Sequence, residues 1–159
     1  MIESPVKAAP QARKAEVQAL VCAVPCGQSR ALVALKLIAE SGGPTGEYFL
    51  PLELPDEDAT KRSLAYLGLT AAIDKLRSLQ VDRVLIVVDD DLLIDELERR
   101  VEPPKELSLQ YIILGCKLNE FRRARVVLSH ATRLEQLRTR AESLASTVYS
   151  TTPLLAHAI

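Results

Sequence analysis

The sequence has little aromatic character and no excess of charge of either sign. Of its 159 residues none is tryptophan, and only 4% are aromatic. This scarcity argues against a surface on which the bases of a single-stranded nucleic acid stack. The chain carries 20 lysines and arginines and 21 aspartates and glutamates, so its formal net charge is -1. A protein that binds a phosphate backbone over a wide surface is usually clearly basic, so such binding would need a local cluster of cations here.

The sequence also lacks a long apolar run and a paired set of cysteines. No stretch approaches the roughly 18 apolar residues of a membrane span, and residues 1–15 contain no apolar core of a secretion signal. The three cysteines, Cys22, Cys26 and Cys116, have neither the even number of a disulfide framework nor the spacing of a zinc site. We therefore expect a cytoplasmic protein with reduced thiols and no membrane partner.

Hydrophobic and charged residues make up 48% and 26% of the chain, which predicts one folded domain. We expect a loose N-terminal arm over residues 1–15, the domain over 16–149 and an irregular C-terminal tail over 150–159. Three apolar runs, separated by turn-forming residues, predict antiparallel strands at the positions 17–23, 31–39 and 47–54.

The period of the hydrophobic pattern changes after Pro55. Acidic residues at positions 56–58 predict the start of a helix, and leucines recur at helical spacing as far as Leu79. The uninterrupted apolar run at residues 84–88 predicts a strand buried on both faces. The remaining segments are two helices, a strand and a last helix, over residues 92–100, 105–121, 125–129 and 134–148. The complete order is β-β-β-α-β-α-α-β-α, which predicts an α/β domain.

Three consecutive acids, Asp89, Asp90 and Asp91, follow the buried strand. Ligands of α/β proteins often bind just beyond the carboxyl ends of strands, so these acids are candidates for holding a cation or a small ligand. The simpler interpretation is that they cap the next helix and complement its positive end. The same string is also similar to the acidic pocket that opens a receiver domain, but too few predicted strands follow it here.

Around these acids the chain resembles the ribonuclease H family. In that family an Asp ends a buried strand and starts a helix, and Asp89 fits this frame. The family's last motif, Ala-Asp-x-Leu-Ala, is matched by Ala-Glu-Ser-Leu-Ala, with Glu142 in the acidic position. His130 follows the last predicted strand, as a family His often does, although it can also be read as an ordinary loop residue. The resemblance implies a mixed five-stranded sheet flanked by helices, with Asp89, Glu142 and His130 as catalytic positions and Asp89, Glu142 and Asp91 as metal ligands.

Two acids of the family pattern are missing. No Asp or Glu occurs at residues 17–39 or 59–73, and the positions that should carry them fall near Ala23 and Gly68. The family hydrolyses a phosphodiester with two divalent ions, and such hard cations need several carboxylates. The resemblance therefore implies a degenerate acidic site. Mg²⁺ or Mn²⁺ is its candidate cofactor, held by at most two matching acids.

Arginines are concentrated near the end of the chain, where six of the thirteen fall within residues 122–140. The candidate contacts to the backbone of a nucleic acid duplex, either an RNA–DNA hybrid or double-stranded RNA, are Lys117, Arg122, Arg123, Arg125 and Arg138. The alternative is a solvated helix face whose cations pair with nearby glutamates.

The helix predicted over residues 105–121 carries more apolar residues than one buried face needs, because Leu109, Ile112 and Ile113 lie off its main stripe. This helix is either deeply buried or in contact with a partner. A second copy of the chain, or a larger protein assembly, is the partner that we consider.

Three functions stay open at this point. The first is a non-catalytic module for nucleic-acid binding or protein assembly, with a degenerate acidic site. The second is a metal-dependent nuclease of RNA–DNA hybrids that recruits acids from elsewhere, such as Glu16, Asp56 or Asp58. The third is an α/β domain that binds a small ligand or a cation at the Asp cluster. The two missing acids favour the first.

Overall fold

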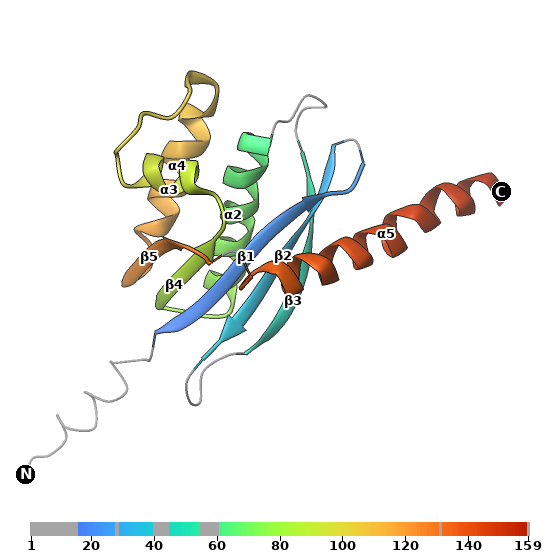
Figure 1. Cartoon of the computed structure of the whole chain (residues 1–159), viewed down its shortest axis with the longest axis horizontal. Helices are drawn as coiled ribbons and strands as arrows, with labels where there is room; N and C mark the ends of the chain where they lie inside the picture. Colours follow the sequence, from blue (N-terminus) through green and yellow to red (C-terminus); the bar gives the residue numbers. More distant parts are fainter. Residues whose placement is uncertain (1–15, 28, 40–44, 55–60, 131, 159) are drawn as a thin grey trace, which may run out of the picture.

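The computed structural model of the chain describes residues 16–27, 29–39, 45–54, 61–130 and 132–158, with side chains described as far as Thr147. The predictions made for residues 1–15, 41–44 and 55–58 fall outside these residues. Figure 1 shows a central sheet with helices on both of its faces. None of the described helices is both long enough and apolar enough to cross a membrane.

The elements follow the predicted order. The strands are β1 (Val17–Pro25), β2 (Arg30–Ile38), β3 (Gly46–Glu53), β4 (Arg83–Val88) and β5 (Arg123–Leu128). The helices are α2 (Lys61–Ser78), α3 (Asp91–Leu97), α4 (Ser108–Leu118) and α5 (Glu135–Ala158), with a 3₁₀ turn, η1 (Lys105–Leu107), before α4. The prediction of a strand rather than a short helix at residues 31–39 is confirmed by β2.

The strands form one mixed sheet in the order β3-β2-β1-β4-β5. The pairs β1–β2 and β2–β3 are antiparallel, whereas β1–β4 and β4–β5 are parallel. The mixed five-stranded sheet is therefore confirmed, with β3 and β5 at its edges. The connection from β1 to its parallel neighbour β4 runs through β2, β3 and α2, and the connection from β4 to β5 runs through α3 and α4.

Side chains alternate between the two faces of the sheet, and each face has its own core. On the first face, Val84, Ile86 and Val88 of β4 pack with residues of α2, α3 and α4. On the second face, Val87 of β4 and residues of β1 and β2 pack with the apolar side of α5, which includes Leu137. Helix α5 lies over β1 and β2. None of the described helices covers the part of the second face formed by the beginnings of β4 and β5, since α5 contacts mainly β1 and β2.

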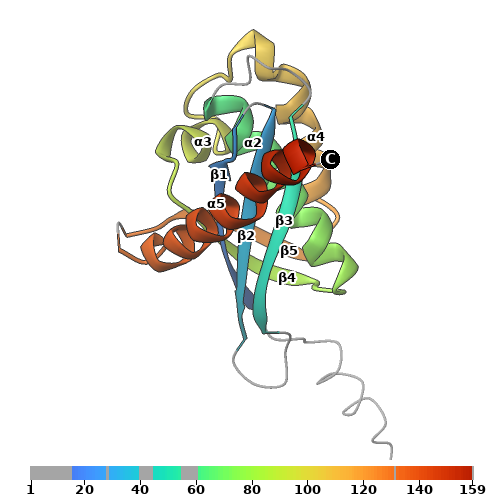
Figure 2. The same cartoon turned by 90° about the vertical axis from the view of Figure 1, so that its right-hand side faces the viewer.

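The chain departs from the predicted elements at two places. Helix α3 ends at Leu97 rather than at residue 100, and Arg99 has a φ of 63°, which an α-helix cannot continue. The prediction of an irregular tail after Tyr149 is wrong, because α5 continues to Ala158 and runs past the β3 edge of the sheet (Figures 1 and 2). Pro153 removes one helical hydrogen bond, but the leucines and alanines that follow it favour a helix.

Candidate functional site

The carboxyl end of β4 brings Asp89, Asp90 and Asp91 to the start of α3. Asp90 caps this helix, since its Oδ1 accepts a hydrogen bond from the backbone N–H of Leu93 at 3.1 Å. Asp91 is the exposed first residue of α3, where a negative charge complements the positive end of the helix. The capping interpretation is therefore confirmed for Asp90, and Asp89 is the acid that remains for another role.

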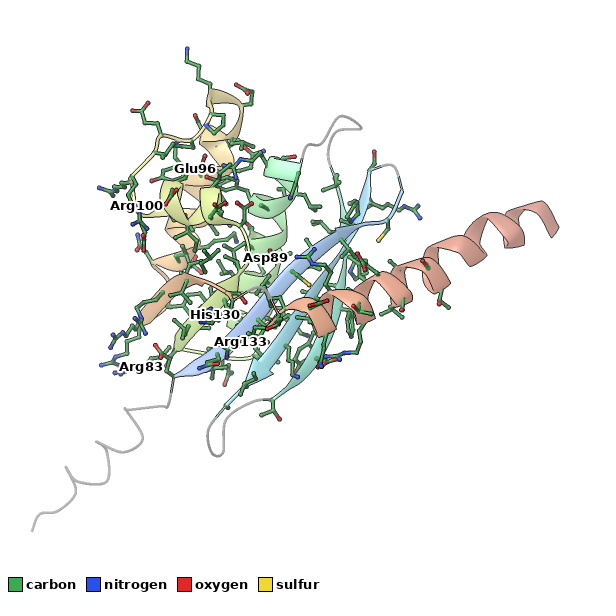
Figure 3. All side chains as sticks on the ribbon, in the orientation of Figure 1. Arg83, Asp89, Glu96, Arg100, His130 and Arg133 are labelled. Atoms are coloured by element: carbon green, nitrogen blue, oxygen red, sulfur yellow. The ribbon has the colours of Figure 1, made fainter. Side chains whose placement is uncertain are left out.

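A pocket of about 340 Å³ opens beside Asp89. Its walls come from β1, α2, the end of β4, the start of α3 and one residue of α5, Arg138. Ala23, Gly68 and Asp89 all line it, so the pocket lies where the ribonuclease H resemblance places three of its four acids. Figure 3 shows Asp89 near the middle of the sheet, at the junction of β1 and β4.

Ala23 and Gly68 close the inner wall of this pocket. A Cβ atom placed on Gly68 would lie 3.0 Å from the Cβ of Ala23 and 3.7 Å from a methyl group of Val33. Carbon atoms in contact ordinarily stay about 3.5–4.0 Å apart, so α2 approaches β1 closely here, and a larger side chain at position 68 would require α2 or β1 to shift. The two positions at which the resemblance expects carboxylates are thus occupied by direct packing of the helix on the sheet.

A guanidinium group, that of Arg138, is the partner of Asp89. Arg138 extends from α5, and its Nη2 donates a hydrogen bond to Oδ2 of Asp89. Because the side chain of Asp89 is about half exposed and that of Arg138 about one third exposed, the pair lies at the mouth of the pocket. The positive charge beside Asp89, the acid that best matches the family's metal ligand, is therefore supplied by an arginine of the same chain.

Cys22 lies close to this pair and is only 4% exposed. Burial raises the pKa of its thiol from about 9 to about 11; the charge of Arg138 lowers this pKa, and those of Asp89 and Glu142 raise it. The charges of Arg138, Asp89 and Glu142 therefore all lie within electrostatic range of this thiol. That Asp89 and Glu142 share a function stays a prediction of the resemblance.

The other two positions that match the ribonuclease H family, Glu142 and His130, are exposed. Glu142 is exposed, one helical turn after Arg138 on α5. His130 is also exposed, in the segment that joins β5 to α5 (Figure 3), and no hydrogen bond joins its ring to another described residue. Glu16 precedes β1, about 20 Å along the strand from Ala23, and Asp56 and Asp58 fall outside the described residues.

These residues do not fit a pair of divalent ions. Of the four carboxylates that the resemblance implies, only Asp89 and Glu142 are present, and Asp89 is already paired with Arg138. Among the described residues there is no group of three or more His, Cys, Asp or Glu side chains that could hold a metal ion.

A second polar cluster adjoins the pocket and was not predicted from the sequence. Glu96 of α3 is only 3% exposed, yet its Oε1 accepts hydrogen bonds from Arg62 and, at 2.6 Å, from the hydroxyl of Tyr66. Arg62 also lies 3.6 Å from Asp90. Burial and the hydrogen bond to Glu96 raise the pKa of Tyr66. No periodic pattern in the sequence links Glu96 to Arg62 and Tyr66, because α2 and α3 come into contact only in the folded chain.

The predicted basic residues separate into paired and unpaired cations. Lys117 of α4 forms an ion pair of 2.7 Å with Asp74 of α2, and Arg138 is paired with Asp89. Arg122, Arg123 and Arg125 are exposed at the edge strand β5. No ion pair joins these three side chains to a carboxylate in the part of the chain that the structure describes.

Two further arginines join Arg123 and Arg125. In the parallel register of β4 and β5, Arg83 pairs with Arg123 and Leu85 pairs with Arg125. Alternation places all four side chains on the second face of the sheet, in the part that α5 leaves uncovered. Arg133 lies on the same side, since it donates a hydrogen bond to Oε1 of Gln18, the β1 neighbour of Leu85.

We call Arg83, Arg123, Arg125 and Arg133 the arginine surface (Figure 3 labels Arg83 and Arg133). No described carboxylate forms an ion pair with any of its four guanidinium groups. The Nε of Arg83 is buried and has no hydrogen-bond partner among the described atoms. Alternation along β4 puts Arg83 on the same side of the strand as Leu85, but that this side meets Arg123 and is not covered by α5 follows only from the fold. The contribution of Arg133 depends on the path of the chain after β5.

Solved structures of other proteins have the same fold. RNase H1 from the halophilic archaeon Halobacterium salinarum NRC-1 is 19% identical, with a TM-score of 0.68 over 80% of this chain and 95% of that one. The N-terminal RNase H domain of a Mycobacterium tuberculosis protein is 15% identical, with a TM-score of 0.68 over 87% and 99% of the two chains. LC11-RNase H1, solved in complex with an RNA/DNA hybrid, is 14% identical, with a TM-score of 0.62 over 81% and 93%. These similarities establish the ribonuclease H-like fold.

Sequence comparison adds nothing to this assignment. No protein-family model matches the chain, and no curated protein matches it at a significant level. At identities below 20%, the structural similarities concern the fold alone.

Proposed function

We propose that this chain, which has the ribonuclease H-like fold, is a non-catalytic module that binds a nucleic acid duplex through its arginine surface. The main support is the arginine surface itself, with four guanidinium groups on one open face and no described carboxylate paired with them. The chain has a net charge of only -1, so this concentration of cations is local.

The placement of these arginines favours an external anion. Like charges directly opposite each other on neighbouring strands are destabilising, and Arg83 stands opposite Arg123. A phosphate group between them would replace this repulsion with charge-assisted hydrogen bonds. Arginine suits this role because its planar guanidinium can donate two parallel N–H groups to one phosphate.

A duplex is favoured over a single strand. Aromatic residues make up only 4% of the chain, so there are few side chains on which unpaired bases could stack. Two proteins with the same fold were solved with duplexes: LC11-RNase H1 with an RNA/DNA hybrid, and a foamy viral protease-reverse transcriptase with double-stranded DNA. Their complexes make an RNA–DNA hybrid the first duplex to test.

The pocket beside Asp89 supports the non-catalytic part of the proposal. Hydrolysis by two metal ions needs carboxylates that hold the ions and neutralise the charge that develops. Here the positions at which the resemblance expects two of those carboxylates fall near Ala23 and Gly68, and the guanidinium of Arg138 is paired with a third acid, Asp89.

The test is the salt dependence of binding to a short RNA–DNA hybrid, measured by fluorescence anisotropy. Four phosphate contacts predict a slope of log K against log salt of about -3.6 if each contributes about -0.9, as on B-form DNA. The variant Arg123→Ala/Arg125→Ala should flatten this slope by about 2 and weaken binding at low salt.

A matched control removes the same charge elsewhere. In Arg100→Ala/Arg140→Ala, both substituted arginines are exposed but paired with carboxylates, namely Asp95 and Glu98 for Arg100 and Glu47 for Arg140. We expect its slope to equal that of the wild type. Equal slopes for the two double variants would show that net charge, rather than the arginine surface, governs binding, and the proposal would fail.

A further inference from the structure

Helix α4 has apolar side chains on two sides, and only one side is used by the fold. Leu114 is fully buried, and Tyr111 and Leu118 pack with it against the core shared with α2. On the opposite side Leu109 is 67% exposed and Ile112 is 58% exposed.

The exposed apolar residues form one continuous stripe. Leu109, Ile112, Ile113 and Cys116 follow one another at steps of three, one and three residues, which places them on one side of a helix. We call these four residues the outer stripe. Among the residues whose exposure the structure describes, seven large hydrophobic residues are exposed, and three of them lie in this single helix. Such a contiguous apolar surface is typical of a site of protein association.

Charged residues stand at the two ends of the outer stripe. Lys105 precedes α4 and Glu120 follows it, and both are exposed. The stripe itself carries no charge. Two copies of α4 in antiparallel orientation would set each Lys105 against the Glu120 of the other copy. A parallel pair would instead oppose like charges at both ends, and it would also align the two helix dipoles unfavourably.

We infer that two copies of this chain associate through their outer stripes, antiparallel about a two-fold axis, with Ile112 of each copy against Ile113 of the other. In this antiparallel register Leu109 faces Cys116 of the other copy. The end of each α4 that follows Lys105 then lies beside the end of the other that precedes Glu120. A two-fold axis makes every such contact occur twice.

The position of α4 is compatible with the arginine surface. Helix α4 covers the first face of the sheet, whereas Arg123 and Arg125 lie on the second. A dimer formed through the outer stripe leaves both arginine surfaces open. The association does not depend on duplex binding, so either property can fail without the other.

The interface is small. Helix α4 has 11 residues and is therefore about 16 Å long. Two helices of this length bury less surface than a standard-size interface, which buries roughly 1,200–2,000 Å² in total. We therefore expect a dimer that dissociates at micromolar concentrations. Sedimentation velocity on the full chain, from about 1 to 200 µM, should show the sedimentation coefficient rise from the monomer value to the dimer value.

A matched pair of substitutions tests the surface. Ile113 is 39% exposed on α4, and Ile38 is 40% exposed at the end of β2. Ile113→Glu should raise the dissociation constant at least roughly tenfold, whereas Ile38→Glu should leave it within about twofold. Circular dichroism identifies a variant that fails to fold. A wild-type chain that stays monomeric throughout, or an equal loss in both variants, would overturn the inference.

Charge reversal tests the antiparallel orientation. Lys105→Glu and Glu120→Lys should each weaken association by about three- to tenfold, because each replaces two ion pairs with two repulsions. The double variant restores both pairs and should recover the wild-type dissociation constant. Additive weakening in the double variant would rule out this orientation.

A disulfide tests the register. In Leu109→Cys, the new thiol faces the Cys116 of the other copy, so mild oxidation should give a covalent dimer. In the wild type the two Cys116 residues are about 10 Å apart along the helix axes, beyond the Cα separation of roughly 7 Å that a disulfide allows. Equal cross-linking in the wild type, or none in Leu109→Cys, would contradict the register.

Discussion

At the carboxyl end of β4, Asp89 and Asp90 lie against arginines of the same chain, Arg138 and Arg62. At the amino end of the same strand, Arg83 stands beside Arg123 and no described carboxylate pairs with it. The two ends are about 20 Å apart, since six residues separate Arg83 from Asp89. One short strand thus joins a region whose charges are satisfied internally to a region whose charges are not.

This difference separates structural charge from charge that is available to a ligand. A carboxylate that already holds a guanidinium gains little from a divalent ion, because the ion must first displace the arginine. A guanidinium without a carboxylate gains from any phosphate that reaches it. The proposal therefore assigns ligand binding to the basic end, where the described guanidinium groups have no carboxylate partner, rather than to the acidic end, where Asp89 and Asp90 lie against arginines.

The largest expected effect concerns the buried pair next to the acidic end. Arg62→Ala leaves Glu96, 3% exposed, with the Tyr66 hydroxyl as its described side-chain partner. Breaking a buried ion pair in this way should lower the free energy of unfolding by about 3 kcal/mol, measured by urea denaturation.

Two variants serve as its controls. Arg62→Ala/Glu96→Gln removes the uncompensated charge and should recover most of the loss. Arg100→Ala breaks only exposed ion pairs and should cost less than about 0.5 kcal/mol. If Arg62→Ala were as mild as Arg100→Ala, the acidic end would not be internally stabilised as described.

The next effect is a pH dependence from Cys22. Its pKa is raised in the folded chain from about 9 to about 11, so the folded state binds the thiol proton more tightly. The resulting stability is fully present below pH 9 and is lost as the pH rises through 11, and it amounts to at most about 2–3 kcal/mol. The free energy of unfolding of the wild type should therefore fall more steeply over this range than that of Cys22→Ala. Parallel curves would place the thiol in a more polar environment than the fold shows.

A smaller change in stability is expected when either of two helical glycines, Gly68 or Gly115, is replaced by alanine. Gly68→Ala should destabilise the chain by about 1 kcal/mol despite the better helix propensity of alanine, because the new Cβ would meet Ala23 at 3.0 Å. Gly115→Ala, in α4, meets nothing within 4 Å and should stabilise the chain by up to about 1 kcal/mol. Thermal unfolding of the two variants distinguishes close packing at the acidic end from a general intolerance of substitution.

The smallest effect concerns the basic end. Arg123→Glu places an acid opposite Arg83 and should stabilise the free chain by about 0.5 kcal/mol, since it replaces a cross-strand repulsion with an attraction. The same variant should lose affinity for a duplex. A variant that is less stable than the wild type would show that the repulsion at the basic end is relieved in some other way.

Much of the fold could be predicted because its signals are local. The apolar run at residues 84–88 is long enough to identify β4, and the absence of acids near Ala23 and Gly68 can be read directly from the sequence. The resemblance to ribonuclease H, carried by Asp89 and Glu142, agrees with the observed sheet order.

The charge pairing could not be predicted, because it depends on contacts between distant segments. Arg138 meets Asp89 across 49 residues, whereas the sequence predicts a metal ligand for Asp89 and a nucleic-acid contact for Arg138. Arg83 was missed since its side of the sheet is known only once the register with β5 and the position of α5 are known. The extension of α5 beyond Tyr149 was missed because the hydrophobic stripe that predicts this helix was followed only as far as Val148.

The most direct test of the account is a single incubation of a labelled RNA–DNA hybrid with the wild-type chain, in Mg²⁺ and separately in Mn²⁺. The products are examined both on a native gel and on a denaturing gel. We expect a shifted complex on the native gel at low salt and full-length strands on the denaturing gel. Cleavage that is lost in Asp89→Asn would contradict the account, because it would show that the acidic end of β4 holds a working metal site.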